Sequence, residues 1–334
     1  LGDVYKRQPI SWAELEPSFG KLGTGYLDLV QKIVKLAEKK EMYLVLDMHQ
    51  FRMSGFPSWM LTKSKTADEA ALRFWKDLTL QVELIKAWKI LASSLKDQKA
   101  VAGYDLLNEP YGGPIAWQDF APILNEFYSK LISEIRSIDS RHIVFFEPVE
   151  GVSVLGEHIA LRPEGMNVVF SPHFYVHGPT EHIENVALRL YNLTANAWKI
   201  PLWVGEFGGA AVEIKDQGSF DSLALILDLF DRYKLGWAYW TLGQTRGGPR
   251  VVDGNGHTSP LLTGMLTRVF PASYTAKDMT FSYNSTPRFQ LSAYAESPGA
   301  IQISVPPVFR STMIRCIDCV FVWDDERLSV TIEL

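Results

Sequence analysis

Two glutamates, Glu109 and Glu206, each close a run of apolar residues and are the first candidates for chemistry. Glu109 lies in the stretch YDLLNEPYGG, and Glu206 lies in WVGEFG, 97 residues later in the chain. Burying a charged carboxylate costs several kcal/mol unless the group is paired or hydrogen-bonded. Each acid therefore needs either an ion-pair partner or a chemical function.

The spacing of these two acids can bring their side chains to the same end of a sheet. A strand and its following helix take about 30 residues, so the interval corresponds to three such units. Two carboxylates about 5 Å apart can hydrolyse a glycosidic bond with retention, one as nucleophile and the other as acid and then base. We expect a crowded pocket to raise the pKa of the acid. On spacing alone, two unrelated acids in separate ion pairs remain the alternative.

The elements that must position these acids follow an alternating pattern. Apolar runs that end in polar residues predict six strands, at 43–50, 100–110, 142–150, 167–175, 201–209 and 236–243. Helical periodicity lies between them, at 26–40, 120–138 and 220–234. Alternating strands and helices imply a parallel sheet with right-handed crossovers. Functional groups at the carboxyl ends of successive strands, without a glycine-rich dinucleotide loop, favour a (β/α)8 TIM barrel.

The pattern changes near residue 270. Short alternating runs such as RFQLSAYA and AIQISVP follow, without helical periodicity, and they predict an antiparallel β-sandwich. We therefore expect a catalytic domain at 9–268 and a C-terminal sandwich at 269–334. We expect the sandwich to support the barrel, with membrane binding as the alternative.

Five motifs in order resemble glycoside hydrolase family 5, across residues 9–250: LDMHQ, LLNEP, SPHFY, WVGEFG and WAYWTLG. The resemblance implies that Glu206 is the nucleophile and that Glu109 is the acid/base. It also implies that Asn108 binds the sugar 2-hydroxyl and that His49 lies in the subsite beside the cleaved bond. No metal or other cofactor is needed for this chemistry.

Three further residues line the site by the same resemblance. His173 and Tyr175 of SPHFY would face it, with the tyrosine hydroxyl directed at the nucleophile, and Trp240 would form a platform beneath the sugar ring. Taken singly, each histidine and this tryptophan would be expected in the core. The remaining strand acids have no predicted catalytic role: Asp47, Asp105, Glu147 and Glu150. Of these, Asp47 is expected to be structural.

Within the family, the chain resembles endoglycoceramidases and related glycolipid glycosidases. The shared features are WAELEPSFGKLGTGYLDLVQKIV, DMHQ before a loop with FPSWM, YDLLNEPYGG, and the appended sandwich from LTRVFP. The apolar loop at 51–60 either folds onto the barrel rim or faces a lipid. The expected substrate is a glycolipid or other β-glucoside. An endo-β-glucanase and an inactive carbohydrate-binding fragment are the alternatives.

The N-terminal residues depart from the family pattern. Residues 9–12, PISW, can end the second barrel strand, but the first strand has no counterpart in the chain. We therefore expect an N-terminally truncated barrel and a non-native leader at 1–8, LGDVYKRQ. Arg7 lies near the position of the family's second-strand arginine, but its context does not fit.

Composition limits the remaining classes of function. The chain has 334 residues and a net charge of −5, with no basic cluster, so nucleic acid is not an expected partner. Cys316 and Cys319 form a lone CxxC without further ligands, which argues against a metal and leaves thiol or disulfide open. We expect a monomer, with peripheral membrane contact left open, and a secreted or lysosome-like location.

Overall fold

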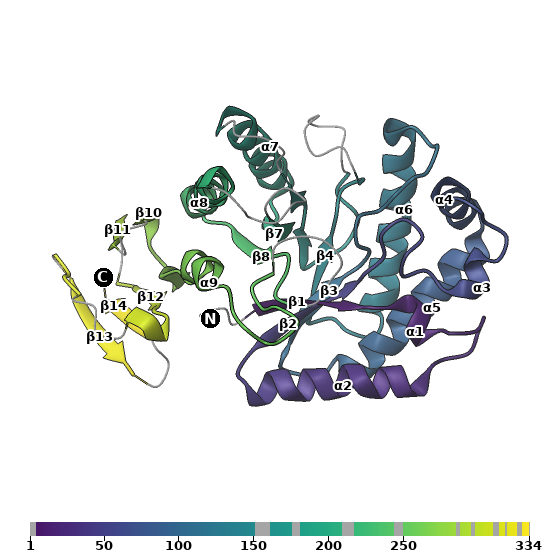
Figure 1. The fold of residues 1–334 in the computed structure, drawn as a ribbon, viewed down its shortest axis with the longest axis horizontal. Helices are drawn as coiled ribbons and strands as arrows, with labels where there is room; N and C mark the ends of the chain where they lie inside the picture. Colours follow the sequence, from purple (N-terminus) through teal and green to yellow (C-terminus); the bar gives the residue numbers. More distant parts are fainter. Residues whose placement is uncertain are drawn as a thin grey trace.

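The computed structural model consists of a parallel barrel followed by a smaller sandwich (Figure 1). It describes residues 5–150, 161–175, 181–208, 217–243, 250–284, 288–294, 298–309, 314–317, 319–325 and 329–333. Among these residues, no helix combines the length and the apolar character that crossing a bilayer would require.

Eight strand segments form the barrel, in two parallel sheets that follow chain order. The first sheet contains β1 (Tyr5–Ile10), β2 (Tyr43–Met48), β3 (Val101–Asp105), β4 (Ile143–Phe146) and β5 (Val168–Phe170). The second contains β6 (His173–Phe174), β7 (Trp203–Phe207) and β8 (Gly236–Tyr239). A parallel bridge from Phe170 to Leu202 joins the two sheets. The strands β5 and β6 together occupy the single run predicted at 167–175, so the predicted parallel barrel is confirmed.

Helices cover the outside of the barrel (Figure 1). They are α1 (Trp12–Leu15), α2 (Thr24–Lys39), α3 (Ser58–Leu61), α4 (Ala67–Lys76), α5 (Leu78–Leu95), α6 (Trp117–Arg136), α7 (Glu181–Trp198), α8 (Gln217–Tyr233) and α9 (Pro260–Leu266). Each long helix buries one apolar face, as α6 does with Leu124, Phe127 and Leu131 at helical spacing. This packing holds the strands and presents their carboxyl ends as one rim.

The start of the chain differs from its prediction. The structure places residues 5–8 inside β1, whose register with β2 sets Arg7 opposite Val45 and Pro9 opposite Asp47. Strand β1 also contacts β8, the last strand of the barrel. The sequence of this strand shows no apolar alternation, because one of its inward-facing side chains is charged. The non-native origin of residues 1–8 and the missing first strand stay predictions.

The C-terminal part is an antiparallel sandwich. One sheet has the order β13-β14-β12-β9 and the other pairs β10 with β11. The bounds are β9 (Phe270–Tyr274), β10 (Lys277–Asn284), β11 (Arg288–Tyr294), β12 (Ala300–Ser304), β13 (Val320–Asp324) and β14 (Ser329–Glu333), with a 3₁₀ turn η1 (Pro307–Phe309) before β13. Buried apolar residues of both sheets, such as Met279 and Ile301, form its core.

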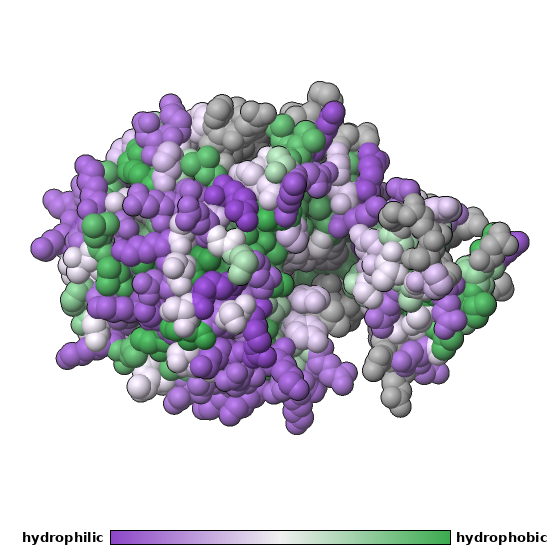
Figure 2. Space-filling view, turned by 180° about the vertical axis from the view of Figure 1, so that it is seen from behind, coloured by the Kyte–Doolittle hydropathy of each residue, from purple (hydrophilic) through white to green (hydrophobic). Residues whose placement is uncertain are grey.

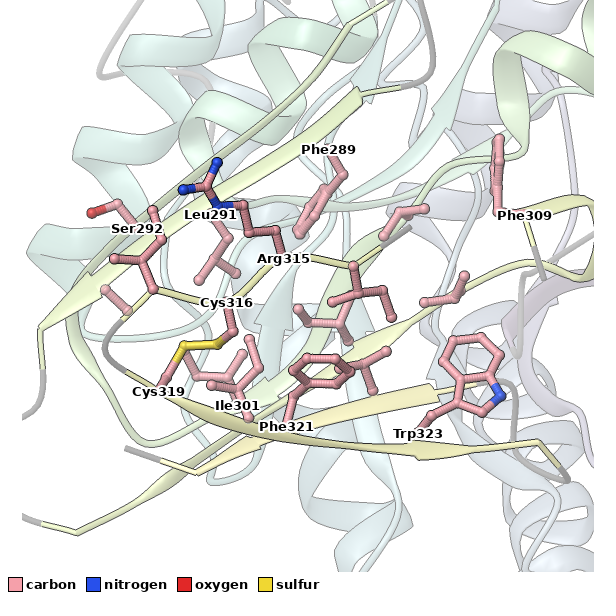
Figure 3. A pocket seen from close by; sticks show the side chains of 18 of the residues that line it. Phe289, Leu291, Ser292, Ile301, Phe309, Arg315, Cys316, Cys319, Phe321 and Trp323 are labelled. Atoms are coloured by element: carbon pink, nitrogen blue, oxygen red, sulfur yellow. A yellow bond between two sulfur atoms is a disulfide. The ribbon is translucent and has the colours of Figure 1, made fainter. Parts of the chain in front are cut away.

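An apolar cavity of about 650 Å³ opens between the two sheets of the sandwich (Figure 3). Phe289, Phe321 and Trp323 line it, and Cys316 and Cys319 form a disulfide at one side. The redox state that the sequence left open is therefore a disulfide. Figure 2 shows hydrophobic surface at the outer edge of this unit.

Arg268 connects the barrel to the sandwich. Its guanidinium donates to Asp231, to Asp228 at 3.1 Å and to the carbonyl of Tyr283 at 3.3 Å. It also lies 4.6 Å from the centre of the Tyr283 ring, which belongs to β10. Both acids belong to α8, so a single buried cation fastens a barrel helix to the sandwich.

Replacing Arg268 with Ala is expected to destabilise the protein by about 3 kcal/mol, because it leaves the buried Asp231 without its cation. Burial raises the pKa of Asp231 from 3.8 to about 6 even with the arginine present. The folded state therefore binds a proton that the unfolded state releases, and stability falls as the pH rises from about 4 to 6. Without Arg268 this fall is larger, so the loss measured by urea unfolding is greater at pH 7 than at pH 4. Asp228→Asn, at the half-exposed partner, is the control with a small effect, and a loss independent of pH would contradict the prediction.

Candidate active site

Glu109 and Glu206 meet at the carboxyl end of the barrel. Glu109 follows β3 and Glu206 lies within β7. One carboxylate oxygen of each acid and a ring nitrogen of His173 all lie within 4.8 Å of one another. Three strand–helix units therefore bring the two acids face to face, close to the separation of about 5 Å found in retaining glycosidases.

Glu206 is held by hydrogen bonds on both of its oxygens. Arg7 Nη1 donates to Oε1 at 2.5 Å, and the Tyr175 hydroxyl donates to Oε2 at 2.9 Å. Burial and the neighbouring Glu206 carboxylate raise the pKa of Tyr175, so this hydroxyl keeps its proton and remains a donor. Two hydrogen bonds, one of them from a cation, fix the orientation of the carboxylate, as a nucleophile requires.

The sequence predicts a raised pKa for Glu109, as suits a general acid, but its surroundings in the structure have the opposite effect. Burial would raise its pKa, but the hydrogen bond and positive charge of His173 outweigh burial, and the pKa of Glu109 is lowered. His173 Nδ1 lies 2.9 Å from Glu109 Oε1. The expectation of a raised pKa is therefore wrong for the free site, because a cation lies next to the acid.

His173 is surrounded by carboxylates. Its Nδ1 lies 2.9 Å from Glu109 and 3.6 Å from Glu206, and its Nε2 lies 3.1 Å from Glu147 Oε1. Burial would lower its pKa, but these acids, Glu147 first, raise it well above its usual value. An acid faces each ring nitrogen, so the surroundings of His173 favour its charged form.

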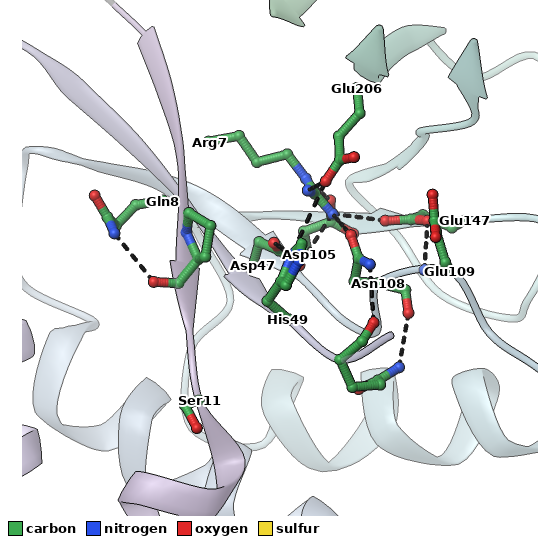
Figure 4. Close-up of polar contacts among 12 residues, drawn as sticks. Arg7, Gln8, Ser11, Asp47, His49, Asp105, Asn108, Glu109, Glu147 and Glu206 are labelled. Carbon is green, nitrogen blue, oxygen red and sulfur yellow. Dashed lines mark hydrogen bonds and ion pairs between the residues drawn. The ribbon is translucent and has the colours of Figure 1, made fainter. Parts of the chain in front are cut away.

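Arg7 occupies the centre of the site, a role that the sequence prediction rejected (Figure 4). Its guanidinium lies within ion-pair distance of four acids: Asp47 at 3.0 Å, Asp105 at 2.7 Å, Glu147 at 2.7 Å and Glu206 at 2.5 Å. Its position five residues before Trp12 was the available signal. The surrounding residues of β1 gave no strand pattern, so the signal was not used.

Asp105 has a raised pKa although it is paired with Arg7. Burial raises the pKa of Asp105 to about 7, although Arg7 Nε donates to it at 2.7 Å. The nearby Glu147 and Asp47 carboxylates also raise it. Because four acids divide the charge of Arg7, one of them retains a proton near neutral pH.

His49 and Trp240 form one side of the site. Their rings stack with centroids 5.1 Å apart and planes 5° from parallel. Asp47 Oδ2 lies 2.7 Å from His49 Nδ1. Burial would lower the pKa of His49, but Asp47 outweighs it and the pKa is raised. Asp47 thus orients an aromatic pair suited to a sugar face, consistent with its predicted structural role.

Asn108 is buried beside Arg7. Its Oδ1 accepts from Arg7 Nη2 at 2.9 Å, and its Nδ2 donates to the carbonyl of Gln50 at 2.9 Å. Gln50 Nε2 returns a bond of 2.8 Å to the Asn108 carbonyl. Binding of a sugar 2-hydroxyl stays a prediction for Asn108, whose side chain the structure places beside Arg7.

Glu147 is the second site residue that the sequence prediction missed. Its carboxylate accepts the backbone N–H of Glu109 at 2.8 Å and a bond from Arg7 Nη2 at 2.7 Å. The usable signal was the pair Glu147-Pro148 directly after β4, which repeats Glu109-Pro110 after β3. Glu150 lies on the rim, with its carboxylate 3.6 Å from Arg52.

Arg7 lies among three acids of the site that could otherwise hold a metal ion. Asp47, Asp105 and Glu147 bring carboxylate oxygens close enough to hold an ion. The guanidinium of Arg7 already lies within 3.0 Å of each of them. The positive charge that these acids need is thus supplied by a side chain.

A parallel barrel with two glutamates facing each other at its carboxyl end defines a glycoside hydrolase. The model of the family described as Cellulase (glycosyl hydrolase family 5) matches residues 6–246, so the chain belongs to this family. The resemblance predicted from the five motifs is thereby confirmed.

The relatives include endoglycoceramidases, as the sequence resemblance predicts. The chain is 24% identical over 345 residues to an endoglycoceramidase of Cyanea nozakii, covering 83% of this chain and 67% of that protein. It is 25% identical over 272 residues to one of Hydra vulgaris, covering 64% of this chain and 51% of that protein. The chain thus spans about two thirds of the length of the first and half of the second.

Solved structures share the fold of both parts. Endo-glycoceramidase II from Rhodococcus sp., in a complex with ganglioside GM3, superposes with a TM-score of 0.77 at 20% identity. The superposition covers 98% of this chain and 85% of that chain. Because the superposition covers nearly the whole chain, the similarity includes the sandwich, whereas the family match ends at residue 246.

Proposed function

We propose that the protein is a retaining β-glycosidase that acts on glycolipids of the glycosylceramide type. The observation that carries the proposal is the pair of carboxylates within 4.8 Å of each other, one of them fixed by two donors. The glycolipid substrate is supported by the endoglycoceramidase relatives and by the ganglioside complex of the structural neighbour.

In the first step, Glu206 attacks the anomeric carbon while Glu109 gives a proton to the leaving oxygen. Glu109 must first gain that proton, because its pKa is lowered. The imidazolium of His173, 2.9 Å away, is the adjacent proton donor. In the second step, Glu109 removes a proton from water, and the water releases the sugar from Glu206. The stacked pair of His49 and Trp240 supports the sugar ring.

The apolar loop after β2 contributes less to lipid binding than its composition implies. Met60 is fully buried, and Trp59 packs edge-on against Trp12 while its indole donates to the Glu16 carbonyl. Phe51 is 46% exposed. Part of the loop is folded onto the barrel, and Phe51 is the most exposed of its apolar side chains, so it is the first candidate to contact an aglycone.

A substrate panel tests the proposal. The chain and its Glu206→Gln variant are assayed on glucosylceramide, on oligoglycosylceramides and on cellulose, with released sugar measured by chromatography. We expect turnover of the lipid glycosides alone, lost in the variant. Activity confined to cellulose would sink the proposal in favour of an endo-β-glucanase. Binding without turnover would favour a carbohydrate-binding protein.

A further inference from the structure

Glu147 lies between the two groups that the acid step needs. It follows β4, its exposed fraction is 2%, and its carboxylate points into the site (Figure 4). Its two oxygens have different partners: Oε2 accepts the N–H of Glu109, and Oε1 lies near Arg7 and His173. A single side chain thus contacts both the backbone of the acid and its proton donor.

The backbone of Glu109 adopts an unfavourable conformation. Its φ is +45°, in the left-handed region that non-glycine residues adopt only at an energetic cost. Hydrogen bonds hold the peptides on each side: Asn108 N–H to Met48 O at 3.1 Å, and Glu150 N–H to Pro110 O at 2.9 Å. The N–H of Glu109 itself is held by Glu147 at 2.8 Å. Without Glu147 as acceptor, the peptide that orients the Glu109 carboxyl loses the hydrogen bond from its own N–H.

His173 depends on Glu147 for its charge. Nδ1 faces Glu109, which must alternately gain and lose a proton in the proposed mechanism, whereas Nε2 lies 3.1 Å from Glu147, which takes no part in that transfer. The titratable groups near this ring are Glu109 after β3, Glu147 after β4, Glu206 in β7, Tyr175 after β6 and Asp47 in β2. The cation of Arg7, in β1, shares Glu147 Oε1 with the ring. Burial raises the pKa of Glu147 itself, while His173 and Arg7 oppose that rise.

We propose that Glu147 is a positioning residue that aims the Glu109 carboxyl and keeps the acid step's proton on His173. The proposal rests on the glycosidase function above. The proton passes from His173 Nδ1 to Glu109 Oε1 and then to the leaving oxygen as its bond to the anomeric carbon breaks. When water attacks the glycosyl ester, its proton returns to Glu109 and then to His173, so the site ends with its starting number of protons.

The Glu147→Gln variant separates positioning from simple support. The amide oxygen still accepts the Glu109 N–H, but the negative charge beside His173 is lost. We expect the basic limb of the pH profile to move about one unit lower, so that kcat for glycosides with alkyl leaving groups falls by about 10-fold on that limb. Glycosides with a 2,4-dinitrophenyl leaving group need little acid assistance, so their glycosylation rate should change by less than threefold.

Two further variants act as controls. Glu150→Gln removes the charge of a rim acid three residues away, and it should leave both the pH profile and the leaving-group dependence as in the parent. Glu147→Asp keeps the negative charge, so the basic limb of its pH profile should lie where it does in the parent. An unmoved pH profile in Glu147→Gln, or an equal loss on both classes of leaving group, would overturn the proposal.

A titration that needs no turnover distinguishes this proposal from the proposed function. The ¹⁵N shifts of His173 are followed by NMR against pH, with His173→Asn used for assignment. We expect the His173 transition to move about one unit lower in Glu147→Gln and to stay in place in Glu150→Gln. If the parent hydrolyses no glycoside, the proposed function fails, whereas an unchanged His173 transition refutes the role of Glu147. If Glu147→Gln does not fold, Glu147→Asp takes its place. Because this variant keeps the negative charge, we expect its His173 transition at the pH of the parent's transition, and a shifted transition would count against the proposal.

Discussion

Replacing Glu206 with Ala is expected to lower kcat by roughly 10⁴-fold or more, because no other described group lies where a nucleophile must attack. The cavity left behind admits azide, which should attack the anomeric carbon from the same side. Glu109 still protonates the leaving oxygen in that reaction. The product should be a glycosyl azide with inverted configuration, identified by its anomeric proton coupling in NMR.

The fold of this variant must be intact for the result to count. Circular dichroism and the thermal midpoint provide that control, since Arg7 retains three other acids as partners. A variant that keeps more than one tenth of the parent kcat, or an azide product of retained configuration, would remove Glu206 from the nucleophile position.

Replacing Glu109 with Ala should have an effect that depends on the leaving group. For an alkyl leaving group, such as that of a glycosylceramide, we expect a loss of about 10²- to 10⁴-fold, the range for general acid catalysis. For a 2,4-dinitrophenyl glycoside the first step should remain fast. Hydrolysis of the glycosyl-enzyme then becomes slow because the base is missing, so KM should fall and a burst of released phenol should appear.

Azide separates the two glutamates once more. In the Glu109→Ala variant it replaces water in the second step, and the expected glycosyl azide has retained configuration, opposite to that from Glu206→Ala. Equal losses for alkyl and dinitrophenyl leaving groups would contradict an acid/base role for Glu109. The pair of variants therefore tests both assignments with one analytical method.

The sequence was sufficient to place the barrel and its two glutamates near each other. Alternating strand and helix patterns defined six of the strands, and an interval of three units predicted that Glu109 and Glu206 face each other. These inferences succeed because strand ends and helical faces carry strong local patterns. The antiparallel sandwich was predictable for the same reason.

The charge network of the site was not predictable from local patterns. Arg7 lies on a strand without alternation, and Glu147 differs from other strand-end acids only through partners distant in the chain. The lowered pKa of Glu109 depends on His173, which is 64 residues away in sequence. Such effects arise from how the strands are brought together, so a sequence pattern records only the residues and not their electrostatic balance.

Arg268 gives the sandwich unequal influence over the two catalytic acids. The helix that it fastens, α8, directly follows the strand of Glu206, whereas Glu109 follows a strand on another part of the barrel. We therefore expect proteolytic loss of the sandwich to weaken the support of Glu206 more than that of Glu109, so that the formation of the covalent intermediate is affected before the protonation of the leaving group.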